Sequence, residues 1–265
     1  IARVALCVDS PQHVSLLEAA ARTAGVRMSV LVEIDVGSRR CGVPAGEEAV
    51  GLARLIAGSR HLAFAGLQAY HGAAQHLRSA VERREAIGKA IAACERTVEG
   101  LSRARIPCGI VSGAGTGTFE LEAASGVYTE LQAGSYCFMD GDYAANLQED
   151  GQPFRTFRHS LFVLASVMST ARPGLAVLDA GHKAVAIERG LPTVWQQPDL
   201  RIVSAADEHA RMEYPAGRAT PEIGERLRLI PGHCDPTVDR FDWYVCVRAG
   251  RVESVWPITA RGGMQ

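Results

Sequence analysis

Long apolar runs, paired cysteines and an excess of either charge are all missing from the 265-residue chain. The longest apolar stretch, LFVLASVM at 161–168, is far shorter than the roughly 20 residues of a membrane helix. The net charge of −1 gives no reason to expect nucleic acid or an anionic membrane as partner. The seven cysteines form no CxxC pair and no secretory leader precedes the first apolar segment, so we expect a soluble cytoplasmic protein.

Lysine is also scarce, with only Lys89 and Lys183 in the chain. A lysine that bonds covalently to a cofactor must be partly desolvated, so that its amine can be neutral and nucleophilic. Lys89 lies mid-helix among charged neighbours, and Lys183 lies in the second half of the chain. We assign this role to neither residue.

The first part of the chain, to about residue 148, alternates short apolar runs with alanine-rich stretches of helical period. Repeated βα units of this kind indicate a parallel sheet. Strands are expected at 3–9, 28–36, 64–71, 108–118 and 127–136, and helices at 11–26, 45–59, 79–104 and 118–125.

From about residue 150 the alanine-rich pattern gives way to short strand-like runs separated by Gly, Pro and Asp. This change predicts an antiparallel β-domain over 150–265, after a βα domain over 1–149. Strands are expected at 162–170, 175–181, 193–198, 227–235, 243–250 and 251–258. The last two form a predicted hairpin that turns at Ala249-Gly250.

Polar residues gather where the predicted parallel strands end. They include Asp35, the Tyr70-His71 pair, the 112–118 turn and the segment 132–136. Five βα units fit either an open doubly wound sheet or part of an eight-unit (β/α)8 barrel, whose active site lies at the carboxyl ends of the strands. A whole barrel typically takes about 250 residues, so about three units would be absent here.

The turn SGAGTGT at 112–118 has the composition of a phosphate-binding loop. Glycines let the backbone approach a phosphate closely, while N–H groups and threonine hydroxyls donate hydrogen bonds. The turn is neither GxGxxG nor a P-loop. By its sequence alone, a glycine-rich turn without a ligand fits equally well.

Two further segments offer candidate side chains. VEIDVGSRRCGV at 32–43 carries adjacent arginines, which would either lie on the surface or donate to an anionic group. LQAYHGAAQHL at 67–77 carries Tyr70, His71 and His76. A histidine here could exchange a proton near neutral pH or be a buried structural residue.

The loop PGHCDP at 231–236 places an imidazole and a carboxylate two residues apart. His233 and Asp235 could bind one divalent ion and leave positions for water and substrate, with Cys234 pointing away. The alternative from spacing alone is an Asp-Pro turn with a packed histidine. No second Cys or His cluster is present to complete a four-ligand zinc site.

Taken in order, these segments resemble the D-threonine aldolase, D-3-hydroxyaspartate aldolase and D-serine dehydratase family of metal-activated pyridoxal 5′-phosphate (PLP) enzymes. The resemblance covers essentially the whole chain. It implies part of an alanine racemase-like (β/α)8 (TIM) barrel, about five of eight units, followed by a D-serine dehydratase-like β-domain. It also implies a homodimer.

The resemblance assigns roles to nine residues. Arg40 and Tyr70 would contact the cofactor, and His76 would be the base near the substrate hydroxyl. The cofactor phosphate would bind to Thr116, Gly117, Thr118 and Tyr136. The metal (Mn, Mg, Co or Zn) would bind to His233 and Asp235.

The implied reaction is a lyase reaction, the retro-aldol cleavage of a D-3-hydroxy amino acid to glycine and an aldehyde. Aldolases of the family read H-x-D in the metal loop and D-serine dehydratases read H-x-C, so Asp235 favours an aldolase. D-serine dehydration to pyruvate and a non-catalytic PLP-binding remnant remain the alternatives. The family's cofactor lysine would lie upstream of Ile1, so residues 1–265 alone are expected to be inactive.

Overall fold

The computed structural model describes residues 4–263 and divides the chain into two compact units. Unit 1 comprises Ile1–Gly134 and Asn146–Gln152, and unit 2 comprises Ser135–Ala145 and Pro153–Gln265. The chain therefore crosses between the units three times near the expected division at 149/150. Of the predicted strand at 3–9, Arg3 lies outside the described residues.

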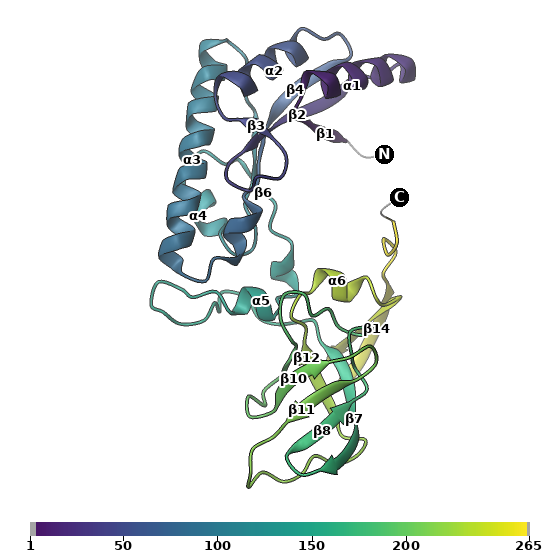
Figure 1. Ribbon diagram of the computed structural model, residues 1–265. Helices are drawn as coiled ribbons and strands as arrows, with labels where there is room; N and C mark the ends of the chain where they lie inside the picture. The colour runs from purple at the N-terminus through teal and green to yellow at the C-terminus, as the bar shows by residue number, and fades with distance from the viewer. Residues whose placement is uncertain (1–3, 264–265) are drawn as a thin grey trace. The chain divides into compact units, whose positions relative to one another are not determined.

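Unit 1 is built on a parallel sheet in the order β1-β2-β4-β5-β6, with the short β3 paired to β2 (Figure 1). Its strands are β1 (Ala5–Val8), β2 (Met28–Asp35), β3 (Val43–Pro44), β4 (Leu62–Ala69), β5 (Ile110–Gly113) and β6 (Glu130–Leu131). Its helices are α1 (Pro11–Ala24), α2 (Glu47–Ala57), η1 (Gly72–His76), α3 (Ala80–Arg103) and α4 (Phe119–Ala124).

Helix α1 begins and ends at residues that cap it. The Ser10 hydroxyl accepts a hydrogen bond from the N–H of His13 at 3.1 Å, and Gly25 ends α1 with a positive φ of 65°. Helix α2 packs against β2 and β4 and lies between α1 and α3. Because neighbouring strands are parallel, their carboxyl ends share one edge of the sheet, and the polar segments after β2, β4, β5 and β6 follow that edge.

Unit 2 contains a six-stranded antiparallel sheet in the order β10-β11-β8-β7-β12-β9. Its strands are β7 (Val163–Arg172), β8 (Leu175–Leu178), β9 (Thr193–Val194), β10 (Arg201–Ala205), β11 (Ala210–Glu213) and β12 (Arg226–Ile230). Buried apolar side chains from these strands, among them Leu178, Met212 and Leu229, form its core. Short helical turns η2 (Ser135–Cys137), α5 (Gly141–Ala144) and α6 (Asp235–Val238) complete the unit, together with a separate hairpin.

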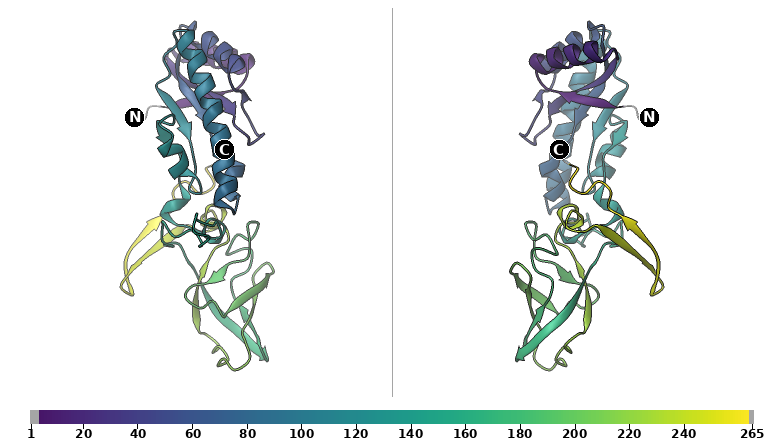
Figure 2. Two further views of the ribbon diagram at one scale, coloured as in Figure 1. Left: turned by 90° about the vertical axis from the view of Figure 1, so that its left-hand side faces the viewer. Right: turned by 90° about the vertical axis from the view of Figure 1, so that its right-hand side faces the viewer.

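That hairpin consists of β13 (Trp243–Arg248) and β14 (Arg251–Pro257) and stands clear of the six-stranded sheet (Figure 2). The predicted turn at Ala249-Gly250 is confirmed, since Arg248 pairs with Arg251 and both turn residues have positive φ, 47° and 76°. Such values are typical of a type I′ turn, which matches the twist of the flanking strands.

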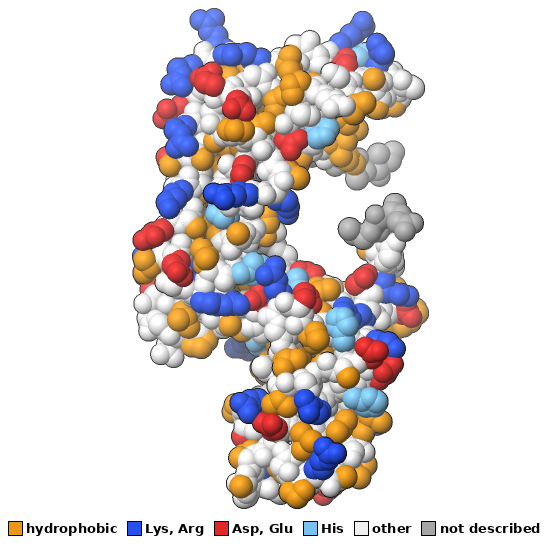
Figure 3. All heavy atoms as spheres, in the orientation of Figure 1, with side chains coloured by type: hydrophobic (Ala, Val, Ile, Leu, Met, Phe, Trp, Pro, Cys, Tyr) orange, Lys and Arg blue, Asp and Glu red, His pale blue; other side chains and the backbone are white. Residues whose placement is uncertain are grey.

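The predicted fold class is confirmed: five principal parallel strands with βα connections precede an antiparallel β-domain. None of the helices within residues 4–263 combines the length and apolar character needed to cross a membrane. Acidic and basic side chains are interspersed over the face drawn in Figure 3, in keeping with the small net charge.

Candidate functional site

The turn after β2 brings Arg40 to Tyr70. The Asp35 carboxylate accepts hydrogen bonds from the N–H groups of Gly37 (2.9 Å) and Arg39 (3.1 Å), which fixes this turn. These bonds, that from Gly37 foremost, lower the pKa of Asp35. The Arg40 guanidinium lies over the Tyr70 ring at 5.8 Å from its centroid, a cation–π distance. Two residues with predicted cofactor roles are thus neighbours.

The segment after β4 carries both candidate histidines. His71 is 8% exposed, and burial lowers its pKa. Its Nδ1 accepts from the N–H of Ala74 at 3.3 Å, so in the neutral ring Nε2 carries the proton. His76 is half-buried at the end of η1. The burial of His71 fits a structural role, whereas His76 keeps partial access to solvent.

Gln75, between these histidines, ties η1 to the glycine-rich turn. It is fully buried. Its Nε2 donates to the Thr118 hydroxyl at 2.8 Å, and its Oε1 accepts from the N–H of Gly117 at 3.0 Å. A Cβ on Gly117 would lie 2.6 Å from the Gln75 carbonyl oxygen, so only glycine fits there. One buried amide therefore fixes the turn relative to the segment that ends at His76.

The turn's hydrogen-bonding groups are only partly free for a ligand. The Thr118 hydroxyl accepts from Gln75 and donates to Glu122 Oε1 at 2.8 Å, and the N–H of Gly117 is occupied by Gln75. By contrast, the Thr116 hydroxyl is 1% exposed and has no hydrogen-bond partner among the described residues. Of the three predicted phosphate contacts in this turn, Thr116 thus has an unused buried donor.

Glu122 is a buried carboxyl beneath this turn, with 1% of its surface exposed. Desolvation raises its pKa to about 7, although the hydrogen bond from Thr118 acts in the opposite direction. Its Oε2 has no partner within the described part of the chain. This carboxyl is therefore held in a setting that favours its protonated form.

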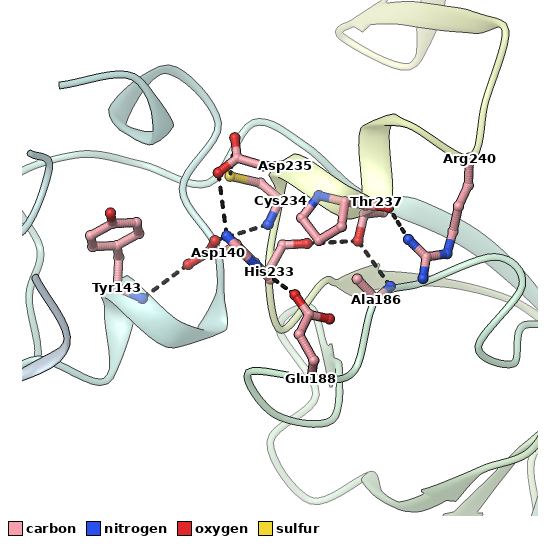
Figure 4. Close-up of polar contacts among 10 residues, drawn as sticks. Asp140, Tyr143, Ala186, Glu188, His233, Cys234, Asp235, Thr237 and Arg240 are labelled. Carbon is pink, nitrogen blue, oxygen red and sulfur yellow. Dashed lines mark hydrogen bonds and ion pairs between the residues drawn. The ribbon is translucent and has the colours of Figure 1, made fainter. Parts of the chain in front are cut away.

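In unit 2 the loop after β12 brings His233 and Asp235 together (Figure 4). His233 Nε2 lies 3.3 Å from Asp235 Oδ2, and His233 Nδ1 lies 2.5 Å from Glu188 Oε1. The hydrogen bond to Asp235, with a further contribution from Glu188, raises the pKa of His233 to about 9. The two predicted metal-binding side chains are therefore neighbours, with His233 Nε2 directed at the Asp235 carboxylate.

The backbone of this loop is fixed by Asp140, which is fully buried. Its carboxylate accepts from the N–H of Cys234 at 2.9 Å and from the N–H of Tyr143 at 2.9 Å (Figure 4). Cys234 is buried, which raises the pKa of its thiol, and it is no candidate for a thiolate ligand. The other predicted residue of unit 2, Tyr136, is half-exposed and packs against Phe157 with 5.3 Å between ring centroids.

The predicted site residues are thus distributed over both units, six in unit 1 and three in unit 2. Within residues 4–263, no three His, Cys, Asp or Glu side chains are grouped so as to hold one metal ion. Three contributors escaped the sequence analysis: Gln75, Asp140 and Glu188. Two of them stand next to recognisable features: Gln75 precedes the candidate base His76, and Asp140 precedes the short helix α5. Glu188 lies 45 positions from His233, and no nearby feature of the sequence points to it.

Comparison with known proteins identifies the family. The protein-family model "Alanine racemase, N-terminal domain" matches residues 1–142, and the family model "Putative serine dehydratase domain" matches residues 160–247. The 3-hydroxy-D-aspartate aldolase of Paracoccus denitrificans (strain Pd 1222) is 44% identical over 263 residues, 98% of this chain and 67% of that protein. This chain belongs to the D-threonine aldolase, D-3-hydroxyaspartate aldolase and D-serine dehydratase family.

Two other members of this family frame the comparison. The crystal structure of D-threonine aldolase from Filomicrobium marinum matches with a TM-score of 0.95 and 41% identity, over 100% of this chain and 71% of that one. The D-threo-3-hydroxyaspartate dehydratase of Delftia sp. (strain HT23) is 27% identical, over 95% of this chain and 70% of that protein. Alanine racemase-like aldolases point to PLP as cofactor.

Proposed function

We propose that this chain forms the catalytic part of a PLP- and divalent-metal-dependent lyase that cleaves D-3-hydroxy amino acids to glycine and an aldehyde. The observation that carries the proposal is the facing pair His233 Nε2 and Asp235 Oδ2, 3.3 Å apart. An aspartate at this position is the aldolase form of the loop. The 44% identity to an aldolase, against 27% to a dehydratase, supports the same choice.

The residues of unit 2 fit a divalent metal. An imidazole nitrogen and a carboxylate oxygen are borderline and hard ligands that suit Mn, Mg, Co or Zn. Two protein ligands leave coordination positions for water and for a substrate oxygen. His233 and Asp235 would hold the ion, and Asp140 holds the loop that carries them through its bond to the N–H of Cys234.

The residues of unit 1 fit PLP. The buried, unpartnered Thr116 hydroxyl is a donor without an acceptor, as expected of a group that receives a phosphate. Gly117 and Thr118 would shape the turn, and Arg40 and Tyr70 would contact the cofactor ring. Tyr136, which belongs to unit 2, is assigned to the phosphate by the family resemblance. Lys183 does not fit the cofactor-bearing role, because its exposed ammonium pairs with Glu208 and the pKa of Lys183 is raised.

His76 is the proposed base. It would take the proton from the substrate 3-hydroxyl while the Cα–Cβ bond breaks, and the balancing proton would be returned to Cα, so that substrate gives aldehyde and glycine without a co-reactant. When bound, PLP supplies the electron sink for this bond and the metal lowers the pKa of the hydroxyl. General-base catalysis typically contributes about 10²–10⁴-fold.

The test uses the complete product of the gene that encodes these residues, loaded with PLP and Mn²⁺. Aldehyde release from D-threonine or D-3-hydroxyaspartate should stop on chelation. We expect His233→Ala to abolish it and His76→Ala to slow it at least 100-fold, as a base should. Asp239→Ala, an exposed residue at the end of α6, is the matched control. Turnover of His76→Ala within a few-fold of the unaltered enzyme would refute the base assignment.

We further propose a homodimer in the reducing cytoplasm. All seven cysteines are free, as expected in a reducing compartment. The dimer rests on the family resemblance. Sedimentation equilibrium should give twice the protomer mass, and a single-protomer mass would contradict it.

A further inference from the structure

Glu188 lies in a loop of unit 2 that is fitted closely to the metal loop. A Cβ on Gly232 would overlap the carbonyl oxygen of Gly190, so the two backbones are in direct contact. On the other side, the Thr237 hydroxyl accepts from the N–H of Ala186 at 3.0 Å. The backbone around Glu188 is therefore fixed relative to residues 232–237 at both ends.

The same Thr237 hydroxyl donates to the carbonyl of His233 at 2.7 Å. Between these backbone contacts, Glu188 Oε1 lies 2.5 Å from His233 Nδ1 (Figure 4). An ionised carboxylate can only accept, so Nδ1 carries a proton.

The two ring nitrogens of an imidazole point in different directions, so a group bound to Nδ1 is not a ligand of an ion bound to Nε2. This agrees with the lack of a three-residue ligand group among residues 4–263. Glu188 instead fixes the ring: with Nδ1–H held by the carboxylate, Nε2 faces Asp235, and a metal bound between them would take the place of the Nε2 proton.

We propose that Glu188 is a positioning residue for the metal site: it sets the tautomer and the orientation of His233. This inference rests on the proposed metal site of the preceding section. When a carboxylate accepts a hydrogen bond from the second ring nitrogen of a metal-binding histidine, removing that carboxylate typically lowers the metal affinity about 10–100-fold. Glu188 is half-exposed, as an ordinary surface ion pair would be, but its backbone is held on both sides by the loop it serves.

The experiment measures Mn²⁺ affinity of the complete gene product by electron paramagnetic resonance, which counts free ion directly. Glu188→Ala should weaken binding about 10–100-fold. Glu188→Gln keeps an oxygen that can accept from Nδ1–H, so it should recover a large part of the loss. The matched control is Glu208→Ala, which removes another exposed, ion-paired glutamate of unit 2 and should leave affinity unchanged.

The outcomes separate this inference from the metal site itself. If His233→Ala loses Mn²⁺ but Glu188→Ala binds within twofold of the unaltered protein, the positioning role is wrong and the metal site stands. If the unaltered protein binds no more Mn²⁺ than His233→Ala, the metal site is wrong and the role of Glu188 falls with it. If circular dichroism shows that Glu188→Ala is unfolded, Glu188→Gln is compared with the unaltered protein instead. The positioning role is refuted if Glu188→Gln has lost the Nδ1–H signal of His233 in ¹⁵N spectra and still binds Mn²⁺ with the affinity of the unaltered protein.

Discussion

Replacing Glu122 with glutamine should stabilise unit 1 at neutral and alkaline pH. Glu122 is 1% exposed, and burial raises its pKa from the ordinary 4.5 to about 7. Between these pH values the folded protein holds a proton that the unfolded chain releases, so this group's contribution to stability falls as pH rises from about 4.5 to about 7 and then stays constant. At about 1.4 kcal/mol per pKa unit, the loss is about 3 kcal/mol.

Glu122→Gln removes this loss, because the amide is neutral at every pH and its oxygen can still accept from Thr118. The variant should match the unaltered protein near pH 4.5 and exceed it by up to about 3 kcal/mol at pH 8. Glu120→Gln, an exposed position on the same helix, is the control and should change stability little.

The assay is urea unfolding followed by far-ultraviolet circular dichroism between pH 4.5 and 8. All three tryptophans lie in unit 2, so tryptophan fluorescence would report the unfolding of unit 2. Most of the helix is in unit 1, so circular dichroism reports mainly the unfolding of unit 1. Parallel pH profiles for Glu122→Gln and the unaltered protein, or a less stable variant at pH 8, would refute the reasoning.

Two further substitutions test contacts that the sequence did not reveal. Gln75→Ala should destabilise unit 1 by about 2–4 kcal/mol in the same assay, because it leaves buried hydrogen-bonding partners unpaired. Its control, Gln12→Ala at an exposed position, should change the stability by no more than about 0.5 kcal/mol. Equal effects of the two substitutions would contradict the bridging role of Gln75. Gly232→Ala should weaken Mn²⁺ binding at least tenfold by displacing the loop, whereas Gly141→Ala, with its nearest atom at 3.5 Å, should be tolerated; unchanged affinity in Gly232→Ala would show that the loop yields without cost.

Local patterns predicted the parts of the structure that local interactions determine. The βα alternation, the helix expected over 11–26 and the two-residue turn at Ala249-Gly250 each depend on residues close in sequence, and the structure has them. Strand ends were less exact: the strand expected over 227–235 stops at Ile230, and Asp235 begins the helical turn α6 instead. Pro231, which lacks an N–H, follows the last strand residue.

Contacts between distant segments were beyond the sequence. Strands β10 and β11 were not predicted, because at five and four residues they are too short to show a clear alternation of apolar and polar side chains. β11 is stabilised by its pairing with β8. Likewise, spacing could not show that the Thr118 hydroxyl is already used by Gln75 and Glu122. Glycine and threonine predict a turn able to approach a phosphate, but which donors remain free is decided by buried groups elsewhere in the chain.

The most direct test of the proposed function is the identity of the products from D-threonine. The complete gene product, with PLP and Mn²⁺, should convert D-threonine to glycine and acetaldehyde in equal amounts, followed by proton nuclear magnetic resonance, and chelation should stop the conversion. Formation of 2-oxobutanoate and ammonia instead would contradict the aldolase assignment and show that Asp235 does not distinguish an aldolase from a dehydratase.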